Sequence, residues 1–283
     1  MTVETLKSLV TDMRSLAPFP HVATTVLSLA SQPGVVPEQL IAVIQTDPGL
    51  TAKVLKLCNS AYYGFQREIA SLEEAGNMVG VRTLTNLVLT SCSARYFQEQ
   101  SAASEDAWQG SVATAVASRM VAQVVGRVEP ERAYTSGLLL NVGELVLAQL
   151  TDEERDRVEA EVQAGRSRVQ AERVILGMSH AEVGARLVTR WMLPEVLTDT
   201  IRHHHTPERA ERNPLLTATV HLGEALAESL AVEDEASAAA SFGARYGVSD
   251  AAWELTDLLP HVLLELRPRL HGELVEAQSA LAA

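Results

Sequence analysis

Apolar residues recur at intervals of three and four along most of the chain, which predicts a protein built from amphipathic helices. The clearest segment begins at Asp47-Pro48, because Asp is a favourable N-cap and Pro is tolerated at the first helical position. Apolar residues then follow at helical spacing, at Leu50, Val54, Leu57 and Ala61. Gly64 is expected to cap the end of this helix, since glycine adopts left-handed backbone without strain.

Three further segments show the same spacing and are predicted to be helices, over Glu38 to Gln45, Arg82 to Phe97 and Trp108 to Val125. No useful stretch alternates apolar and polar residues, and Phe, Trp and Tyr together make up only 4% of the chain. Strands favour both alternation and aromatic residues. We therefore predict an all-α fold.

Two polar stretches suggest how the helices are grouped. Gln98 to Asp106 is small and polar, and Val232 to Ser241 is acidic and rich in Ala and Ser. We predict an N-terminal helical half over residues 1–100, a second helical half over 101–231, and an acidic linker with a C-terminal helical extension over 232–283. A leucine stripe in this extension, from Leu255 to Leu274, can pack on the body or on a second copy, so homodimerisation through it is a possibility. Pro260 and Pro268 oppose a continuous coiled coil.

Composition excludes several classes of protein. The chain has 283 residues, of which 47% are hydrophobic and 21% charged, so it is not a disordered protein. The longest apolar run, Ser136 to Leu150, is interrupted by Asn141 and Glu144, which predicts no membrane span. The first residues, MTVETLKSLV, do not resemble a signal peptide. Two distant cysteines, Cys58 and Cys92, suit reduced thiols and no zinc site. We expect a cytoplasmic protein.

The charge is acidic and uneven. The formal net charge is −13, and residues 151–283 alone hold 13 basic and 23 acidic side chains. A protein that binds nucleic acid usually carries a basic stripe that neutralises phosphates. Direct binding of nucleic acid is therefore disfavoured.

Three segments, taken in order, carry a resemblance to a known family. They are LAPFPHVATTVLSLA with IQTDPGLTAKVLKLCNSAYYGF, then AYTSGLLLNVGELVL, and finally MSHAEVGARLVTRWMLPEVLTDTIRHHHTPE. Together they resemble the HDOD family, the HD-related output domain of bacterial signalling proteins, over roughly residues 8–225. The resemblance implies an N-terminal helical bundle joined to a degenerate helical domain of the HD-phosphohydrolase type. It also implies a non-catalytic role in which the domain binds signalling partners.

The residues can be tested against the metal-ligand pattern of HD hydrolases, which need an adjacent His-Asp pair, further histidines and a later Asp to hold divalent cations. The matching positions here are Leu140 and Asn141, and the later Asp aligns with Gly223. Leu and Gly offer no ligand, and Asn offers only a neutral carbonyl oxygen. We therefore predict no catalysis, no metal and no cofactor.

Several histidines remain. Ser179 and Glu182 form a capping box, which places His180 in the first turn of a helix and at its inward edge. His204 and His205 continue the inward face of the next helix, at three and four residues from Ile201. With Asn141, these histidines can line a vestigial pocket.

Two interpretations of this pocket are open. The favoured one is that its residues are structural histidines, because no carboxylate companion is evident in the sequence. The other is a pocket that binds a nucleotide, such as a cyclic dinucleotide, without hydrolysing it. The remaining histidines that look isolated receive no role, namely His21, His221, His261 and His271.

A candidate partner surface lies at Asn59, Ser60, Tyr62 and Tyr63, where a helix ends and a turn begins. Asn and Ser commonly bond to local backbone groups in such turns. Adjacent tyrosines do not face inward with the same orientation, so one of them is a candidate for contact with a partner. Closure of the turn against the next helix is the structural alternative, and it is favoured.

The sequence thus favours a non-catalytic signalling adaptor that acts through protein contacts with partners of unknown identity. A ligand sensor that uses the vestigial pocket is the first alternative. A metal-dependent phosphohydrolase with unusual ligands is a weaker one.

Overall fold

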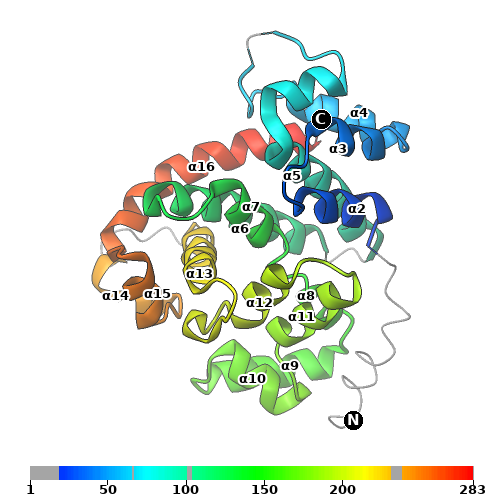
Figure 1. Ribbon diagram of the computed structural model, residues 1–283. Coiled ribbons are helices and arrows are strands. Elements are labelled where there is room, and N and C mark those ends of the chain that lie inside the picture. The colour runs from blue at the N-terminus through cyan, green and yellow to red at the C-terminus, as the bar shows by residue number, and fades with distance from the viewer. Residues whose placement is uncertain (1–18, 66, 101–103, 231–237, 283) are drawn as a thin grey trace.

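The computed structural model describes residues 19–65, 67–100, 104–230 and 238–282, and it is shown in Figure 1. Within these ranges the chain forms helices and connecting loops and no strand. The predicted all-α fold is therefore confirmed.

Four helices at the top of Figure 1 make up the N-terminal part. They are α2 (His21–Ala30), α3 (Pro37–Ile44), α4 (Pro48–Cys58) and α5 (Leu72–Gln100). α5 packs against the other three. Gly80, with φ of 75°, interrupts the helical backbone of α5, so the helix expected from Arg82 corresponds to its second segment.

The start of α4 agrees with the prediction and its end does not. The Asp47 side chain accepts a hydrogen bond from the Leu50 N–H at 3.0 Å, and Pro48 is the first helical residue. The helix ends at Cys58, however, and not at Gly64. Asn59 terminates it because its side-chain amide donates to the carbonyl of Leu55 at 3.0 Å. Gly64 has φ of 63° and belongs to the turn that follows.

The second part of the chain is built around α6, which packs against α7 and α13. Its helices are α6 (Ser104–Val125), α7 (Pro130–Leu138), α8 (Glu144–Leu147), α9 (Asp152–Gln163), α10 (Arg168–Leu176), α11 (His180–Arg190), α12 (Glu195–His203), the 3₁₀ helix η2 (Pro207–Arg209) and α13 (Pro214–Ser229). Helices α9 and α10 pair at the bottom of Figure 1, below α11 and α12.

Three helices complete the chain: α14 (Ala238–Arg245), α15 (Asp250–Thr256) and α16 (Pro260–Ala282). α16 continues through Pro268, lies across α6 and reaches α4, as the red ribbon in Figure 1 shows. Three leucines of the predicted stripe, Leu263, Leu270 and Leu274, are buried against the body of the same chain. The stripe therefore gives no support to homodimerisation through the extension, which stays a prediction.

The hydrophobic core is continuous between the N-terminal part and the second part. Phe19 stacks on Trp191 with ring centroids 4.6 Å apart, and Tyr96 of α5 meets the same indole edge-on at 5.4 Å. Aromatic pairs of this kind add stability beyond the area that they bury.

The predicted boundaries stay predictions. α5 and α6 enter the stretch from Gln98 to Asp106 from both sides, and residues 101–103 lie outside the described ranges. So do residues 231–237, which form most of the second predicted linker, and residues 1–18.

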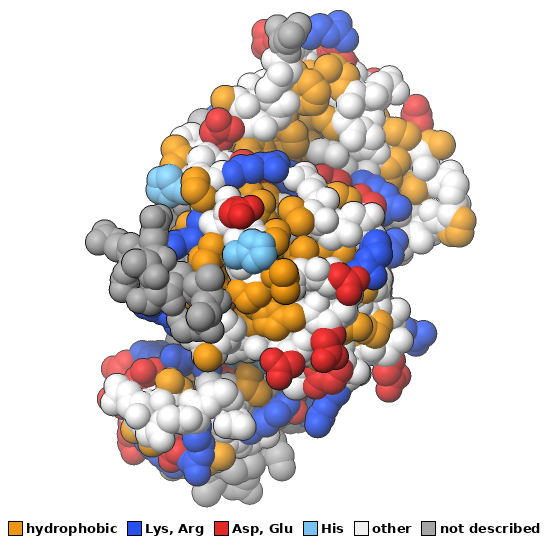
Figure 2. All heavy atoms as spheres, turned by 90° about the vertical axis from the view of Figure 1, so that its left-hand side faces the viewer, with side chains coloured by type: hydrophobic (Ala, Val, Ile, Leu, Met, Phe, Trp, Pro, Cys, Tyr) orange, Lys and Arg blue, Asp and Glu red, His pale blue; other side chains and the backbone are white. Residues whose placement is uncertain are grey.

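Two surface features bear on the expected partners. Among the described helices, none combines the length and the apolar character that crossing a membrane requires. On the face shown in Figure 2, Lys and Arg side chains are scattered among Asp and Glu, with apolar side chains near the centre. This face offers no basic stripe for a nucleic acid.

Candidate functional site

The site is built from the beginning of α11 and the end of α12. Ser179 and Glu182 form the predicted capping box, since the Ser179 N–H donates to the Glu182 carboxylate at 2.8 Å. His180 is therefore the first helical residue, and it is buried. The face that it shares with Val183 and Leu187 points into the core.

His204 and His205 follow the last turn of α12 and meet His180. The Nε2 atom of His180 lies 3.3 Å from Nε2 of His204 and 2.9 Å from Nε2 of His205. His204 is fully buried and His205 is half-buried. The structure therefore brings together the three histidines that the sequence predicted to line one pocket. His203 instead lies outside the cluster, with Nε2 3.8 Å from the carboxylate of Asp199 on its own helix.

A buried carboxylate from α10 orients the first of these rings. Glu172 Oε2 accepts from the backbone N–H of His180 at 2.8 Å and lies 2.7 Å from its Nδ1. Nδ1 of His204 lies 2.7 Å from the carbonyl oxygen of Ile201. A carbonyl or carboxylate only accepts hydrogen bonds, so each Nδ1 carries the hydrogen and each neutral ring presents the lone pair of its Nε2.

α13 contributes two further groups. Glu224 Oε2 lies 3.9 Å from His204 Nε2, and Glu224 Oε1 accepts from the Asn141 amide at 2.8 Å. His221 is buried, its Nε2 accepts from the Ser249 N–H at 3.3 Å, and its Nδ1 has no hydrogen-bond partner. Nitrogen and oxygen atoms of His205, His221 and Glu224 lie within 4.8 Å of one another.

Two expectations about these residues were wrong. His221 is not isolated, because it lies in this cluster together with His205. The histidines also have carboxylate companions, namely Glu172 and Glu224. The sequence conceals both acids because they lie on helices far from the histidine motifs. One usable signal was present, since His221 and Glu224 are polar residues among the small and apolar residues in the middle of α13.

Of the three positions that match the ligands of HD hydrolases, only Asn141 contacts a residue of the cluster, through Glu224. Leu140 is fully buried in an apolar cluster with Ala122, Val128 and Leu216. Gly223 lies against α6, where a Cβ would fall 2.6 Å from the Cα of Ser118. Position 223 is therefore a point of close helix packing, and the acid that α13 turns toward the histidines is Glu224.

Burial and the surrounding acids set the charges of the cluster. Burial lowers the pKa of His204 to about 4 and lowers the pKa values of His205 and His221 as well. Burial also lowers the pKa of His180, but the hydrogen bond and charge of Glu172 outweigh it, so that this pKa lies above its usual value. Burial raises the pKa of Glu144. At neutral pH His204, His205 and His221 are thus neutral bases among acids.

A cleft of about 450 Å³ opens beside Glu144 and Glu172, between α8, α9 and α10. Its two arginines are engaged, since Arg155 donates to the carbonyl of Leu150 at 2.7 Å and Arg168 donates to Glu159 at 3.0 Å. The cleft therefore offers an anionic ligand such as a nucleotide little free positive charge.

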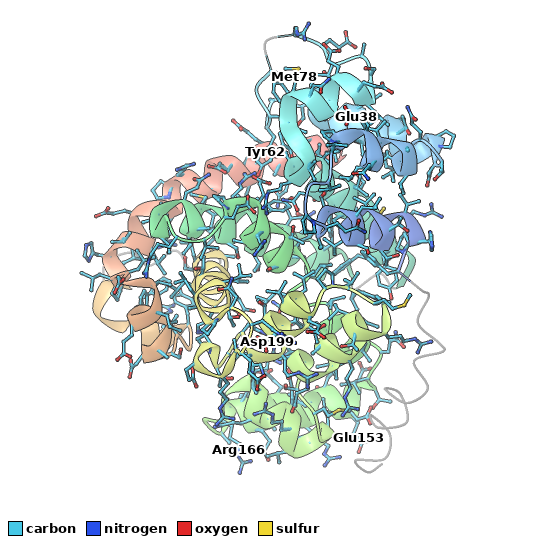
Figure 3. All side chains as sticks on the ribbon, in the orientation of Figure 1. Glu38, Tyr62, Met78, Glu153, Arg166 and Asp199 are labelled. Carbon is cyan, nitrogen blue, oxygen red and sulfur yellow. The ribbon has the colours of Figure 1, made fainter. Side chains whose placement is uncertain are left out.

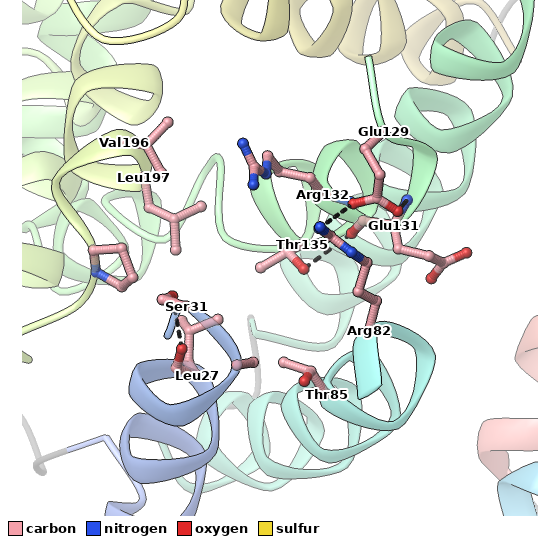
Figure 4. Close-up of a pocket in the computed structure, with 12 residues that line it drawn as sticks. Leu27, Ser31, Arg82, Thr85, Glu129, Glu131, Arg132, Thr135, Val196 and Leu197 are labelled. Carbon is pink, nitrogen blue, oxygen red and sulfur yellow. Dashed lines mark hydrogen bonds and ion pairs between the residues drawn. The ribbon is translucent and has the colours of Figure 1, made fainter. Parts of the chain in front are cut away.

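A second groove, of about 240 Å³, separates the N-terminal helices α2 and α5 from α7 and α12 (Figure 4). Leu27 and Leu197 face each other across it, and Arg82 donates to Glu129 at 2.6 Å along its rim. Arg132 also lines this groove and is exposed. The groove combines an apolar floor with charged edges, which is typical of surfaces that bind proteins.

The predicted partner surface mostly closes the chain on itself. The Asn59 side chain donates to the Ile69 carbonyl at 2.9 Å and accepts from the Ile69 N–H at 2.7 Å. Ser60 donates to the carbonyl of Leu57 at 2.7 Å. These bonds favour the structural interpretation of the turn. Asn59 and Ser60 also line a groove against α16, so contact with a partner there stays a prediction.

Both tyrosines of this turn are half-buried, and their rings meet edge-on at 5.1 Å. Tyr62 lies where the N-terminal helices meet α16 (Figure 3), and its hydroxyl accepts from Arg119. Neither tyrosine is the exposed one that the sequence suggested.

The helices and the buried histidine cluster define an all-helical domain, in which Leu140 and Asn141 occupy the positions that the resemblance assigns to a His-Asp pair. Within that class the chain belongs to the HDOD family, because the model of the HDOD domain matches residues 16–207. The resemblance found in the sequence is thereby confirmed.

One curated relative is an uncharacterised protein of Treponema pallidum (strain Nichols), 32% identical over 192 residues. That match covers 66% of this chain and 37% of the relative, so the chain spans well under two thirds of the relative's length.

Solved structures share the fold. An HDOD domain protein of unknown function from Geobacter sulfurreducens superposes with a TM-score of 0.79 at 23% identity, covering 98% of this chain and 99% of its own. A protein from Shewanella amazonensis SB2B, provisionally described as a phosphohydrolase, gives 0.74 at 23% identity, covering 98% and 97%. A protein from Marinobacter aquaeolei VT8, provisionally described as a signal transduction protein, gives 0.70 at 22% identity, covering 99% and 65%.

Proposed function

We propose that the chain is a non-catalytic regulatory module of bacterial signalling that acts by binding partner proteins. The observation that carries this proposal is the full burial of Leu140 among apolar side chains, in the turn that follows α7. A metal-dependent hydrolase needs ligands that leave an open position for water and substrate beside an activating group. At the two positions where the related hydrolases carry a His-Asp pair, this chain supplies a core residue and an amide.

The groove between α2, α5, α7 and α12 is the surface we assign to the partner. Helices from both parts of the chain line this groove, so a partner bound there would contact both parts. Its binding would then depend on how the two parts are arranged. A nucleotide in the histidine pocket is a weaker alternative, because Glu172, Glu224 and Glu144 oppose an anionic ligand.

The absence of catalysis can be tested with protein loaded separately with Mn²⁺, Fe²⁺ and Zn²⁺. Phosphomonoesters, phosphodiesters and a cyclic dinucleotide would be offered as substrates. We expect no turnover above that of the free metal ion. Turnover that scales with protein concentration would contradict the proposal.

The partner surface can be tested by placing a photo-crosslinking amino acid at Arg132, on the rim of the groove, in living cells. The matched control is Glu153, an exposed residue of α9 that lies far from the groove (Figure 3). We expect a discrete adduct from position 132 and none from position 153. Equal adduct patterns at both positions would contradict the assignment of the groove.

A further inference from the structure

We infer that His180, His204 and His205 bind a divalent transition-metal ion, with Zn²⁺ as the representative case, through their Nε2 atoms. The Nε2 atoms of His204 and His205 lie 3.3 Å and 2.9 Å from Nε2 of His180, and a ligand atom from each of the three rings lies within 4.8 Å of the others. In a tetrahedral zinc site with Zn–N bonds of about 2.0–2.1 Å, neighbouring ligand atoms lie about 3.3 Å apart. The spacing of the three nitrogens therefore suits an ion at their centre.

The hydrogen bonds behind the rings prepare these nitrogens for a cation. Glu172 and the carbonyl of Ile201 hold the Nδ1 hydrogens of His180 and His204, so each neutral ring keeps a lone pair on Nε2, and these two nitrogens lie 3.3 Å apart. Histidines that ligate metals almost always donate their other N–H to a carboxylate or a carbonyl in this way. Lone pairs this close repel each other unless a proton or a cation lies between them.

A fourth ligand is within reach on α13. Glu224 Oε2 lies 3.9 Å from His204 Nε2, and Asn141 holds the other oxygen of that carboxylate. His221, whose buried Nδ1 has no hydrogen-bond partner, forms a second group with His205 and Glu224, in which a ligand atom of each lies within 4.8 Å of the others. Either Glu224 or His221 would add the fourth ligand to the three histidines.

The chemistry of the ligands selects the class of ion. Imidazole favours Zn, Cu, Fe and Ni, whereas Mg²⁺ and Ca²⁺ prefer sets of oxygen ligands. Glu172 and Glu224 supply negative charge that offsets a divalent cation in this buried place. The inference does not depend on the proposed function, because an ion can be held by imidazoles without activating water.

The test uses the full chain, stripped with a chelator and equilibrated by dialysis against buffered Zn²⁺, with metal per chain measured by mass spectrometry. Co²⁺ replaces Zn²⁺ in a parallel titration, because its visible absorption reports the ligand geometry. We expect one Zn²⁺ per chain and a Co²⁺ spectrum of a four-coordinate nitrogen-rich site. Wild-type protein that holds no stoichiometric Zn²⁺ would overturn the inference.

Variants separate this site from other histidines. His205→Gln changes the half-buried member of the triad and is expected to weaken Zn²⁺ binding about 100-fold, whereas Glu172→Gln, behind the ring, weakens it about 10-fold. His203→Gln is the matched control, because His203 neighbours the triad in the sequence but contacts Asp199. Circular dichroism checks that each variant is folded.

Each result decides the matter. Loss of binding in folded His205→Gln with full binding in His203→Gln supports the site. Equal loss in both variants, or full binding in His205→Gln, overturns it. Should His205→Gln fail to fold, two other measurements test the site. A four-coordinate nitrogen-rich Co²⁺ spectrum of wild type and weaker Zn²⁺ binding by Glu172→Gln support it, and the absence of both overturns it. A Zn²⁺-loaded protein that hydrolyses phosphate esters would overturn the proposed function and leave the metal site standing.

Discussion

Gly143 packs directly against the backbone of His180, so closely that a Cβ at position 143 would lie 2.9 Å from the carbonyl carbon of His180 and 2.7 Å from the N–H nitrogen of Gly184. The loop before α8 and the first turn of α11 are thus in backbone contact. This contact fixes the histidine at the start of α11 relative to Asn141, which lies two residues before Gly143.

Gly143→Ala is therefore expected to lower the free energy of unfolding by about 3 kcal/mol, because the new methyl group meets backbone that cannot move aside cheaply. Urea denaturation followed by circular dichroism measures the change. The matched control is Gly110→Ala on α6, where a Cβ meets open space. Removing that helical glycine should raise stability by about 0.5–1 kcal/mol. Equal effects of the two substitutions would contradict the packing described.

Glu172 is predicted to stabilise the protein as well as orient His180. Glu172→Ala leaves a buried backbone N–H and a buried ring nitrogen without their acceptor, and is expected to cost about 3 kcal/mol. Glu172→Gln keeps one acceptor oxygen and should cost about 1 kcal/mol. Urea unfolding midpoints give both values.

The control for Glu172 is Glu159, which pairs with Arg168 at 3.0 Å while both side chains are about half exposed. Exposed ion pairs contribute little, so Glu159→Ala should change stability by about 0.5 kcal/mol or less. If Glu159→Ala and Glu172→Ala lowered the free energy of unfolding equally, burial would not explain the cost expected at Glu172.

The sequence predicted those parts of the site that depend on local pattern. The S-x-x-E box placed His180 at a helix start, and helical periodicity placed His204 and His205 on an inward face. Glu172 and Glu224 escaped notice because their contacts join residues 8 and 20 positions away across separate helices. Such contacts depend on how helices pack, and a single sequence carries no spacing rule for them.

Arg119 is predicted to fasten α16 to the rest of the protein. Its guanidinium lies 5.0 Å from the ring centre of Tyr62 and 5.5 Å from that of Tyr134, and it donates to Glu273 of α16 at 3.2 Å. Arg119→Ala should lower stability by about 1–2 kcal/mol, because it removes two cation–π contacts and one of the two ion pairs of Glu273, the other being with Arg269 at 2.8 Å.

Limited proteolysis of Arg119→Ala is expected to cleave α16 earlier than in wild type. The control is Arg127, whose pair with Asp257 at 2.8 Å is exposed on both sides. Arg127→Ala should change stability by about 0.5 kcal/mol at most. Unchanged proteolysis of α16 in Arg119→Ala would show that its leucines hold the helix without this contact.

Both thiols are predicted to be unreactive in the folded protein. Cys58 and Cys92 are free and buried, and burial raises the pKa of Cys58 to about 11 and that of Cys92 to about 12, from the usual 9.0. The thiolate is the nucleophile, so an aromatic disulfide reagent should label neither residue at neutral pH and both after unfolding in urea. Because the folded pKa values are raised, the unfolded chain loses these protons first, and stability should fall as the pH rises above 9.0. The stability of the Cys58→Ala, Cys92→Ala double variant should fall less steeply over the same pH range. In the labelling experiment, rapid reaction of the native wild-type protein would contradict the prediction and mean that α4 or α5 opens readily.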